Sequence, residues 1–341
     1  MQPAAPGSDL PTFSVGITNV VVPVTVQDRD GNIVNGIQPR QFFLADNSKL
    51  QNIVVDVAFH PVSLVLAIQA NSAVEAILPQ VKKIGPLIDN LVVGDQGEVA
   101  VMAFDHRFQW KTDFTSDPGK VTEALKKITA GSSTSALIDA MDEGVRKLRN
   151  RPKNRRKVML VLAETRDNGS EGKMRDALLD AEFADVIVYT VNMSRMIATL
   201  TDKPYPRPGA YNGLPPATYP MPSGVPATPT SVLQSGQVPG TAIEVVPLLV
   251  EIFKDVKAIF VDNPAEKMTK ATGGQEFSFF KQRGLEEAVS KVASELHSQY
   301  LITYSPSNKE EGGWHDIKVV VQDHPEVKLR YRPGYWIATS R

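Results

Sequence analysis

The sequence contains no cysteine among its 341 residues. This absence excludes disulfide scaffolds, thiolate nucleophiles, and zinc or iron–sulfur sites held by cysteine. The sequence also lacks the run of about 18 apolar residues that would predict a membrane-spanning helix.

An excess of charge of either sign is also missing. Lysine and arginine number 37 and aspartate and glutamate 38, so the formal net charge is −1. With this balance, the chain as a whole does not attract an anionic partner by long-range electrostatics. We therefore predict no specific nucleic-acid binding. Hydrophobic residues make up 42% and charged residues 22%, values typical of folded globular chains rather than of disordered or fibrous ones.

Familiar catalytic motifs are absent as well. The five histidines form no zinc-binding His-Glu-x-x-His pattern, and the chain has no Gly-x-Ser-x-Gly, P-loop or Gly-x-Gly-x-x-Gly sequence. No set of residues indicates a nucleophile with its base. We therefore expect a protein that is not an enzyme.

The two ends of the chain show patterns typical of β-strands. Residues 14–60 predict an antiparallel module, with a hairpin turn at Asp28-Arg29-Asp30-Gly31 and a second strand pair at 41–45 and 52–57. Alternating apolar residues return over 306–341. We expect the two terminal segments to build one sheet together.

Residues 61–305 alternate between short apolar runs and helical periodicity. Buried strands are predicted at 63–68, 99–104, 157–162 and 186–191. Helical stretches are predicted at 73–91, 118–128, 135–148, 171–184, 243–260, 264–271 and 285–296, the first of them interrupted or kinked at Pro79 and Pro86. This alternation predicts an α/β fold with a doubly wound, mostly parallel sheet, whose carboxyl edge is the default site.

Two segments fall outside this pattern. Residues 1–13 are small and proline-rich, without the basic and apolar regions of a signal peptide, as in an exported protein after processing. We expect export to the periplasm, envelope or exterior; the alternative is a disordered start of a cytosolic protein. Residues 201–240 hold 10 of the 25 prolines and predict a surface insertion, or alternatively an arm that docks on a partner.

Several short motifs occur in a characteristic order. They are Val22-Pro-Val-Thr-Val-Gln-Asp-Arg-Asp-Gly31, Gln38-Pro-Arg-Gln-Phe42, Thr272-Gly-Gly274, Ser298-Gln-Tyr-Leu-Ile-Thr-Tyr-Ser-Pro306 and Arg332-Pro-Gly-Tyr335. In this order the chain resembles a von Willebrand factor type A domain, specifically the acidobacterial-type exported proteins related to it. The resemblance implies a Rossmann-like α/β domain with a metal-ion-dependent adhesion site at the top of its sheet.

The residues at the implied metal positions depart from the family pattern. Where the family has Asp-x-Ser-x-Ser, this chain has Gln69, Asn71 and Ala73. Ser135 stands in the position of the family's threonine, and Glu164 replaces an aspartate. The adhesion site is therefore degenerate by comparison with the family.

The replacements remove ligands that Mg²⁺ prefers, because one carboxylate becomes an amide and one hydroxyl a methyl group. We expect no tightly bound metal and no cofactor, and weak Mg²⁺ or Mn²⁺ binding stays an open alternative. The polar side chains left at this edge are predicted to recognise a partner without an ion: Gln69, Asn71, Ser72, Thr134, Ser135 and Glu164.

A basic segment precedes the strand predicted at 157–162. Eight of the twelve residues from 146 to 157 are lysine or arginine. The structural interpretation is a solvated connector whose cations favour a helix C-terminus. The functional alternative is a binding patch made of Arg149, Arg151, Lys153, Arg155 and Arg156.

Taken together, these patterns predict a non-enzymatic module for protein interaction, adhesion or assembly, working in a larger complex or a homo-oligomer. One alternative is an A domain that binds its ligand through a divalent metal. Another is a structural envelope or extracellular protein that self-associates through strand edges. A hydrolase using Glu164 and Asn71 is the least favoured alternative.

Overall fold

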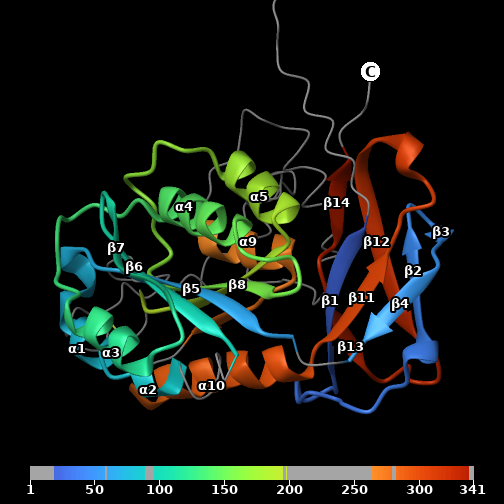
Figure 1. Cartoon of the computed structure of the whole chain (residues 1–341), viewed down its shortest axis with the longest axis horizontal. Helices are drawn as coiled ribbons and strands as arrows, with labels where there is room; N and C mark the ends of the chain where they lie inside the picture. Colours follow the sequence, from blue (N-terminus) through green and yellow to red (C-terminus); the bar gives the residue numbers. More distant parts are fainter. Residues whose placement is uncertain are drawn as a thin grey trace, which may run out of the picture.

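The computed structural model describes residues 19–57, 60–88, 96–194, 197, 263–278 and 282–337. The predicted leader 1–13, the proline-rich segment 201–240 and the helix expected at 243–260 lie outside the described residues. The described chain forms an α/β body and a β-sandwich that stand next to each other (Figure 1).

The α/β body is built on a six-stranded sheet with the order β10-β9-β8-β5-β6-β7. Its strands are β5 (Val62–Gln69), β6 (Glu98–Phe104), β7 (Phe108–Thr115), β8 (Arg156–Ala163), β9 (Val186–Asn192) and β10 (Glu276–Ser278). Neighbouring strands run parallel except at the β6–β7 edge. All eight residues of the central strand β5 are buried, which explains its unbroken apolar run. The predicted α/β class is confirmed.

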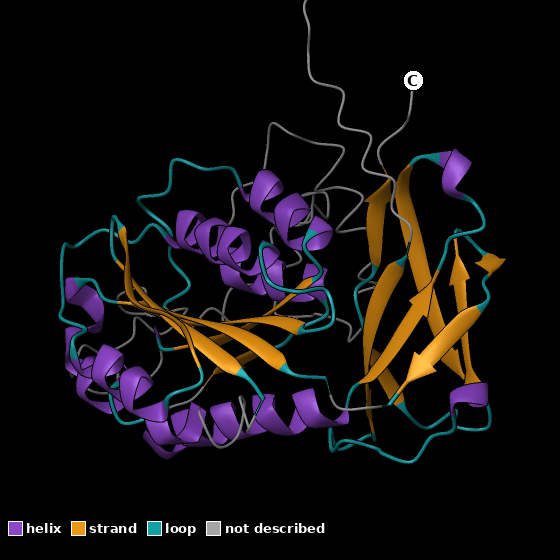
Figure 2. Cartoon of the chain, viewed as in Figure 1, coloured by secondary structure: helices purple, strands orange, loops and turns teal. Residues whose placement is uncertain are grey.

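Helices cover both faces of this sheet (Figure 2). One layer contains α4 (Leu137–Arg149), α5 (Met174–Phe183) and α9 (Pro264–Thr272). The other contains the 3₁₀ helix η2 (Ser72–Ile77), α1 (Leu78–Val81), α2 (Gly85–Ile88), α3 (Pro118–Lys126) and α10 (Gln282–Ser298). Each layer closes its own apolar core against the sheet. Because a fully buried Val or Leu side chain contributes ~1.5–3 kcal/mol, these cores fix the sheet edges that carry the candidate site.

The helical stretch expected over 73–91 is interrupted near Pro79 and Pro86, as predicted, because proline lacks an N–H; the described part forms η2, α1 and α2. The strand β7 was not predicted. It is a half-exposed edge strand with irregular pairing to β6, so it lacks the apolar run of the inner strands.

The β-sandwich combines both ends of the chain in two four-stranded antiparallel sheets, β13-β1-β11-β4 and β14-β12-β2-β3. The N-terminal half supplies β1 (Val20–Gln27), η1 (Pro39–Gln41), β2 (Phe42–Asp46), β3 (Lys49–Leu50) and β4 (Ile53–Asp56). The C-terminal half supplies β11 (Tyr300–Tyr304), η5 (Lys309–Glu311), β12 (Gly313–Val321), β13 (Lys328–Arg330) and β14 (Gly334–Ile337). An apolar core fills the space between the sheets.

This arrangement corrects three expectations. The termini build two sheets, because the alternating strands need a second apolar face to bury their own. The predicted pairing of 41–45 with 52–57 does not form; β4 pairs with β11 in the opposite sheet. Strand β11 thus belongs to the sandwich, so the boundary that was expected after residue 305 lies before this strand rather than after it.

A buried carboxylate joins the two bodies. Glu295 of α10 accepts hydrogen bonds from the Tyr189 hydroxyl at 2.5 Å, the Thr25 hydroxyl at 3.1 Å and the Gln299 amide at 3.0 Å. Arg330 of β13 adds an ion pair. Since these partners come from both bodies, the sandwich is anchored to the base of the α/β sheet.

Candidate functional site

The candidate site lies where β5 and β8 end at the carboxyl edge of the sheet. Gln69, the last residue of β5, is fully buried. Its Oε1 accepts a hydrogen bond from the Glu164 backbone N–H at 2.7 Å, and its Nε2 donates to Oδ1 of Asn71 at 3.0 Å. The amide therefore ties the two strand ends together with both its polar ends occupied.

The neighbouring loop brings the hydroxyl residues to this edge. Asn71 donates through Nδ2 to the Ser133 carbonyl at 3.4 Å, and the Ser72 backbone N–H donates to the Ser132 carbonyl at 2.8 Å. The Ser72 side chain is exposed, whereas Ser135 is buried. Within the described residues the Ser135 hydroxyl has no hydrogen-bond partner.

Glu164 supplies the carboxylate at this edge. Its side chain is half-buried and makes no hydrogen bond within the described part of the chain. Burial raises the pKa of Glu164, and the nearby Arg166 opposes this effect. The predicted six-residue site is thus assembled in part by direct bonds among Gln69, Asn71 and Glu164, and in part by the loop that carries Thr134 and Ser135.

Two residues that the sequence analysis missed organise this loop. Asp105, directly after β6, accepts hydrogen bonds from the backbone N–H groups of Ser132 and Arg107, both at 2.9 Å. Burial alone would raise the pKa of Asp105, but these hydrogen bonds outweigh it and the pKa is lowered. His106 lies 2.8 Å from the Ser132 hydroxyl through Nδ1. Their position just after a predicted strand was the available signal.

The close approach of this loop requires glycine at one position. A Cβ atom on Gly131 would lie 2.3 Å from Oδ2 of Asp105, so any larger residue would push the loop away. The contact between Gly131 and the Asp105 carboxylate therefore sets how closely the loop approaches the sheet edge.

The residues at this edge do not fit a divalent ion. Both polar atoms of the Gln69 amide are already bonded, and Ala73 offers only a methyl group. Mg²⁺ needs near-octahedral oxygen ligands, normally including carboxylates. Among the residues that the structure describes, no cluster of three or more His, Asp or Glu could hold a metal. These side chains therefore do not provide the ligand set of a metal-ion-dependent adhesion site.

Three of the five cations of the predicted basic patch form ion pairs with acidic residues of the chain. Arg149 forms an ion pair with Asp180 at 2.6 Å. Arg151 makes two hydrogen bonds of 2.7 Å to Glu98, which Arg155 also approaches at 3.3 Å. These pairs favour the structural interpretation of the segment.

The last members of the predicted patch have different surroundings. Arg156 is buried and donates to the Leu296 carbonyl and the Gln299 side chain, because it closes the C-terminal end of α10. Lys153 is exposed. The five residues thus do not form one continuous cationic surface: the expected patch is interrupted where Arg156 enters the interior.

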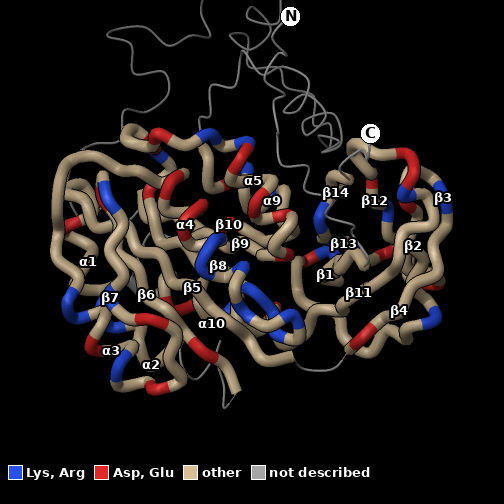
Figure 3. Tube along the Cα trace, turned by 45° about the horizontal axis from the view of Figure 1, so that its top comes forward, with Lys and Arg blue, Asp and Glu red and all other residues tan. Residues whose placement is uncertain are grey.

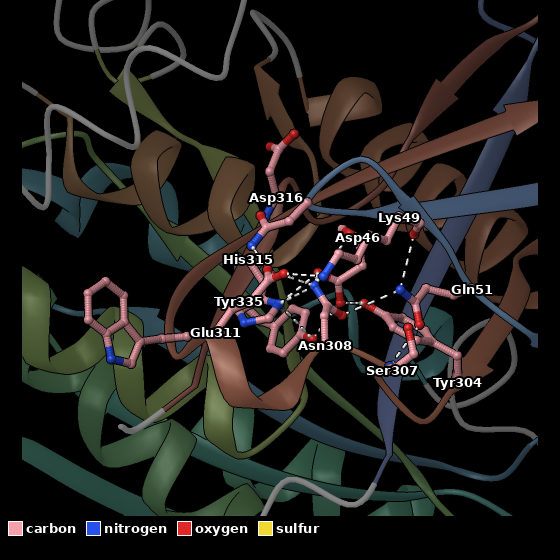
Figure 4. Close-up of polar contacts among 12 residues, drawn as sticks. Asp46, Lys49, Gln51, Tyr304, Ser307, Asn308, Glu311, His315, Asp316 and Tyr335 are labelled. Carbon is pink, nitrogen blue, oxygen red and sulfur yellow. Dashed lines mark hydrogen bonds and ion pairs between the residues drawn. The ribbon is translucent and has the colours of Figure 1, made fainter. Parts of the chain in front are cut away.

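A second polar cluster is sealed inside the sandwich (Figure 4). The Asp46 carboxylate accepts from the Tyr304 and Tyr335 hydroxyls at 2.9 and 2.6 Å and from the Asn308 amide at 3.1 Å, and lies 2.7 Å from His315 Nδ1. Asp46 and His315 are fully buried. Four partners from the C-terminal half converge on one N-terminal carboxylate, so this cluster locks the sandwich rather than offering an active site.

The comparisons with known proteins give remote similarity only. No family model matches the chain, and no curated protein matches its sequence. Among solved structures, the aerotolerance-related membrane protein from Bacteroides fragilis is 13% identical, with a TM-score of 0.41, covering 69% of this chain and 99% of its own. BatB from Bacteroides thetaiotaomicron is 17% identical, with a TM-score of 0.39, covering 68% of this chain and 99% of its own.

The SpRpn10 von Willebrand A domain is 12% identical, with a TM-score of 0.31, covering 39% of this chain and 75% of its own. Because these scores are low, the fold assignment rests on the strand order itself. That order, parallel except at one edge and covered by helices on both faces, agrees with the von Willebrand A-like architecture expected from the sequence.

Within the described residues, no helix has the length and apolar character needed to cross a membrane.

Proposed function

We propose that this chain is a non-enzymatic interaction module of an exported assembly, and that it docks a protein partner through the carboxyl edge of its α/β sheet without a divalent ion. The observation that carries the proposal is the doubly bonded Gln69 amide. It occupies the position of a metal-binding aspartate in the family, yet it uses both polar atoms to hold the edge together.

The rest of the edge supports recognition by surface contacts. The loop before α4 is held by Asp105, so its serine and threonine groups have fixed positions. Ser72 is exposed and Glu164 half-buried, which leaves a hydroxyl and a carboxylate for a partner. Such pre-positioned polar groups give specificity at little cost in ordering.

The structure gives little support to a hydrolase. Such an enzyme would need a nucleophile activated by a neighbouring base. The hydroxyl of Ser135 has no hydrogen-bond partner within the described residues, and the Glu164 carboxylate is not bonded to it. The edge is therefore better interpreted as a contact surface.

The test isolates partners from the native source with the tagged full chain, in parallel in EDTA and in Mg²⁺. Glu164→Lys and Ser72→Arg alter the proposed surface, and Lys126→Glu on α3 is the matched control because Lys126 is exposed on another element. We expect one partner retained in EDTA and by the control, and lost with both edge variants. Loss of that partner in EDTA, together with micromolar Mg²⁺ or Mn²⁺ binding by calorimetry, would instead establish the metal-dependent alternative.

Self-association is a second candidate, favoured by the edge strand β4. Val54 is 70% exposed on this strand, and Val57 just beyond it is 61% exposed. Strand edges are usually protected by charge or proline; the four residues of β4 contain no proline, and their one charge is Asp56 at the end of the strand. Sedimentation over a range of concentrations tests it: a dimer that Val54→Lys dissociates would support self-association, and a strict monomer would exclude it.

A further inference from the structure

A cleft of about 500 Å³ lies between the α/β body and the sandwich, at the edge of the sheet opposite the candidate site. The loop before β8 and the end of α5 form one wall, and β1 and β11 form the other. Figure 3 shows the lysines and arginines that precede β8 next to these sandwich strands. Clefts of this size at domain boundaries are common binding sites for small molecules.

Part of the sandwich wall of the cleft is apolar, beside polar residues such as Asn19 and Thr303. Val21, Pro23 and Leu301 line it from β1 and β11, on the sheet face that points away from the sandwich core. Phe183, at the end of α5, lines the cleft from the other wall and is 44% exposed. Apolar groups left open in a concave site indicate a ligand with an apolar body.

The carboxylates that line the cleft already have partners. Asp185 lies 3.2 Å from Arg332, and Glu182 approaches the same guanidinium at 3.6 Å. Asp56 is 2.9 Å from His60. Each of these three carboxylates therefore has a basic neighbour in the lining, and Glu182 and Asp185 share the single guanidinium of Arg332.

Two lysines in the lining have no such pairing. Among the described residues, no carboxylate forms an ion pair with Lys153 or Lys157. In the same part of the chain, the ammonium group of Lys157 donates only to the Arg149 carbonyl, at 3.4 Å. Asp185 faces both lysines at longer range, but its carboxylate is bonded to Arg332. Burial also lowers the pKa of Lys157, as expected for an ammonium group without a close anion.

We propose that this cleft binds an amphipathic anion, a molecule with an apolar body and one carboxylate or phosphate group. The body lies against Val21, Leu301 and Phe183, and the anionic group lies between Lys153 and Lys157. The site goes beyond the proposed partner surface, because it lies at the other end of the sheet and uses none of that surface's residues.

The first test uses the fluorescent probe anilinonaphthalene sulfonate, an aromatic anion, with the full chain. We expect saturable binding that Lys153→Glu combined with Lys157→Glu weakens about tenfold or more, since charge reversal turns attraction into repulsion. Phe183→Ser should weaken it as well. The matched control, Lys126→Glu with Lys127→Glu on the α3 side, should bind like the wild type, and circular dichroism confirms folding of each variant.

Competition completes the test. Monomeric dodecanoate should displace the probe, and dodecyltrimethylammonium, of equal chain length and opposite charge, should not. Displacement by phosphatidylglycerol vesicles as well would identify a lipid as the source of the anion, whereas displacement by dodecanoate alone would identify a free acid. Equal displacement by both amphiphiles would overturn the proposal. So would a loss of probe affinity in Phe43→Ser, on the outer face of the sandwich, with no loss in the lysine variant.

Discussion

Two strands end in a fully buried polar side chain: Asp46 in the sandwich and Gln69 at the carboxyl edge of the α/β sheet. The two side chains differ in the number of hydrogen-bond partners around them. Four partners surround the Asp46 carboxylate, all from the C-terminal half of the chain. The Gln69 amide has one donor and one acceptor as neighbours. A buried carboxylate is thus kept where donors converge, and a neutral amide stands where they do not.

The largest effect is expected from Asp46→Ala. It leaves four buried polar groups facing an empty space, so the free energy of unfolding should fall by ~3–5 kcal/mol. Urea denaturation measures this change, with the exposed Glu310→Ala as control. If both variants unfold at the same urea concentration, Asp46 does not lock the sandwich.

A smaller effect is expected from Glu295→Ala at the junction. This carboxylate also has four donors, but one of them, Arg330, is partly exposed and can be solvated when its partner is lost. We expect a loss of ~2–3 kcal/mol and a broader transition, because the two bodies are then less tightly coupled. Calorimetry would contradict this if the variant kept a single sharp transition at the wild-type temperature.

Gln69 tests the other side of the comparison. Gln69→Ala should cost ~1–3 kcal/mol, because the Glu164 N–H and the Asn71 side chain lose their partner. Gln69→Asp should also destabilise the chain in EDTA, since it brings a second carboxylate close to Glu164. Millimolar Mg²⁺ should restore part of that loss in Gln69→Asp and leave the wild type unchanged. An equal Mg²⁺ effect on the wild-type melting temperature would show that the native edge binds metal.

The sequence predicted those parts of the molecule that depend on local patterns. The apolar run of β5 indicated a strand buried on both faces, and the motif positions located Gln69, Asn71 and Glu164 at one edge. The pairing of β4 with β11 could not be predicted, because the two strands lie far apart in sequence and many partners fit the same alternation.

The polar clusters were missed for a related reason. Asp46 and Glu295 are ordinary acidic residues in sequence, and their importance comes from donors contributed by distant segments. The burial of Arg156 could not be predicted from the sequence either. It belongs to a basic segment, yet it is the member of that segment that is buried in the fold.

The smallest effect concerns Glu182, a partly buried carboxylate with fewer donors than Asp46. It receives the Trp336 backbone N–H and lies 3.6 Å from Arg332. Burial raises the pKa of Glu182 from 4.5 to about 6, against the opposing effect of Arg332. The comparison with Gln69 therefore predicts that an amide would suit this position at neutral pH.

The direction of the pH effect follows from proton binding. Between pH 4.5 and about 6 the folded chain holds a proton on Glu182 that the unfolded chain has released. The free energy of unfolding must therefore fall as the pH rises through this window, by roughly 1–2 kcal/mol, and then level off. In Glu182→Gln this contribution should disappear, so the variant should gain stability relative to wild type as pH rises from 4.5 to 7. A wild-type-to-variant difference that stays constant across the window, measured by urea denaturation, would show that partners at Glu182 compensate its charge as fully as those at Asp46.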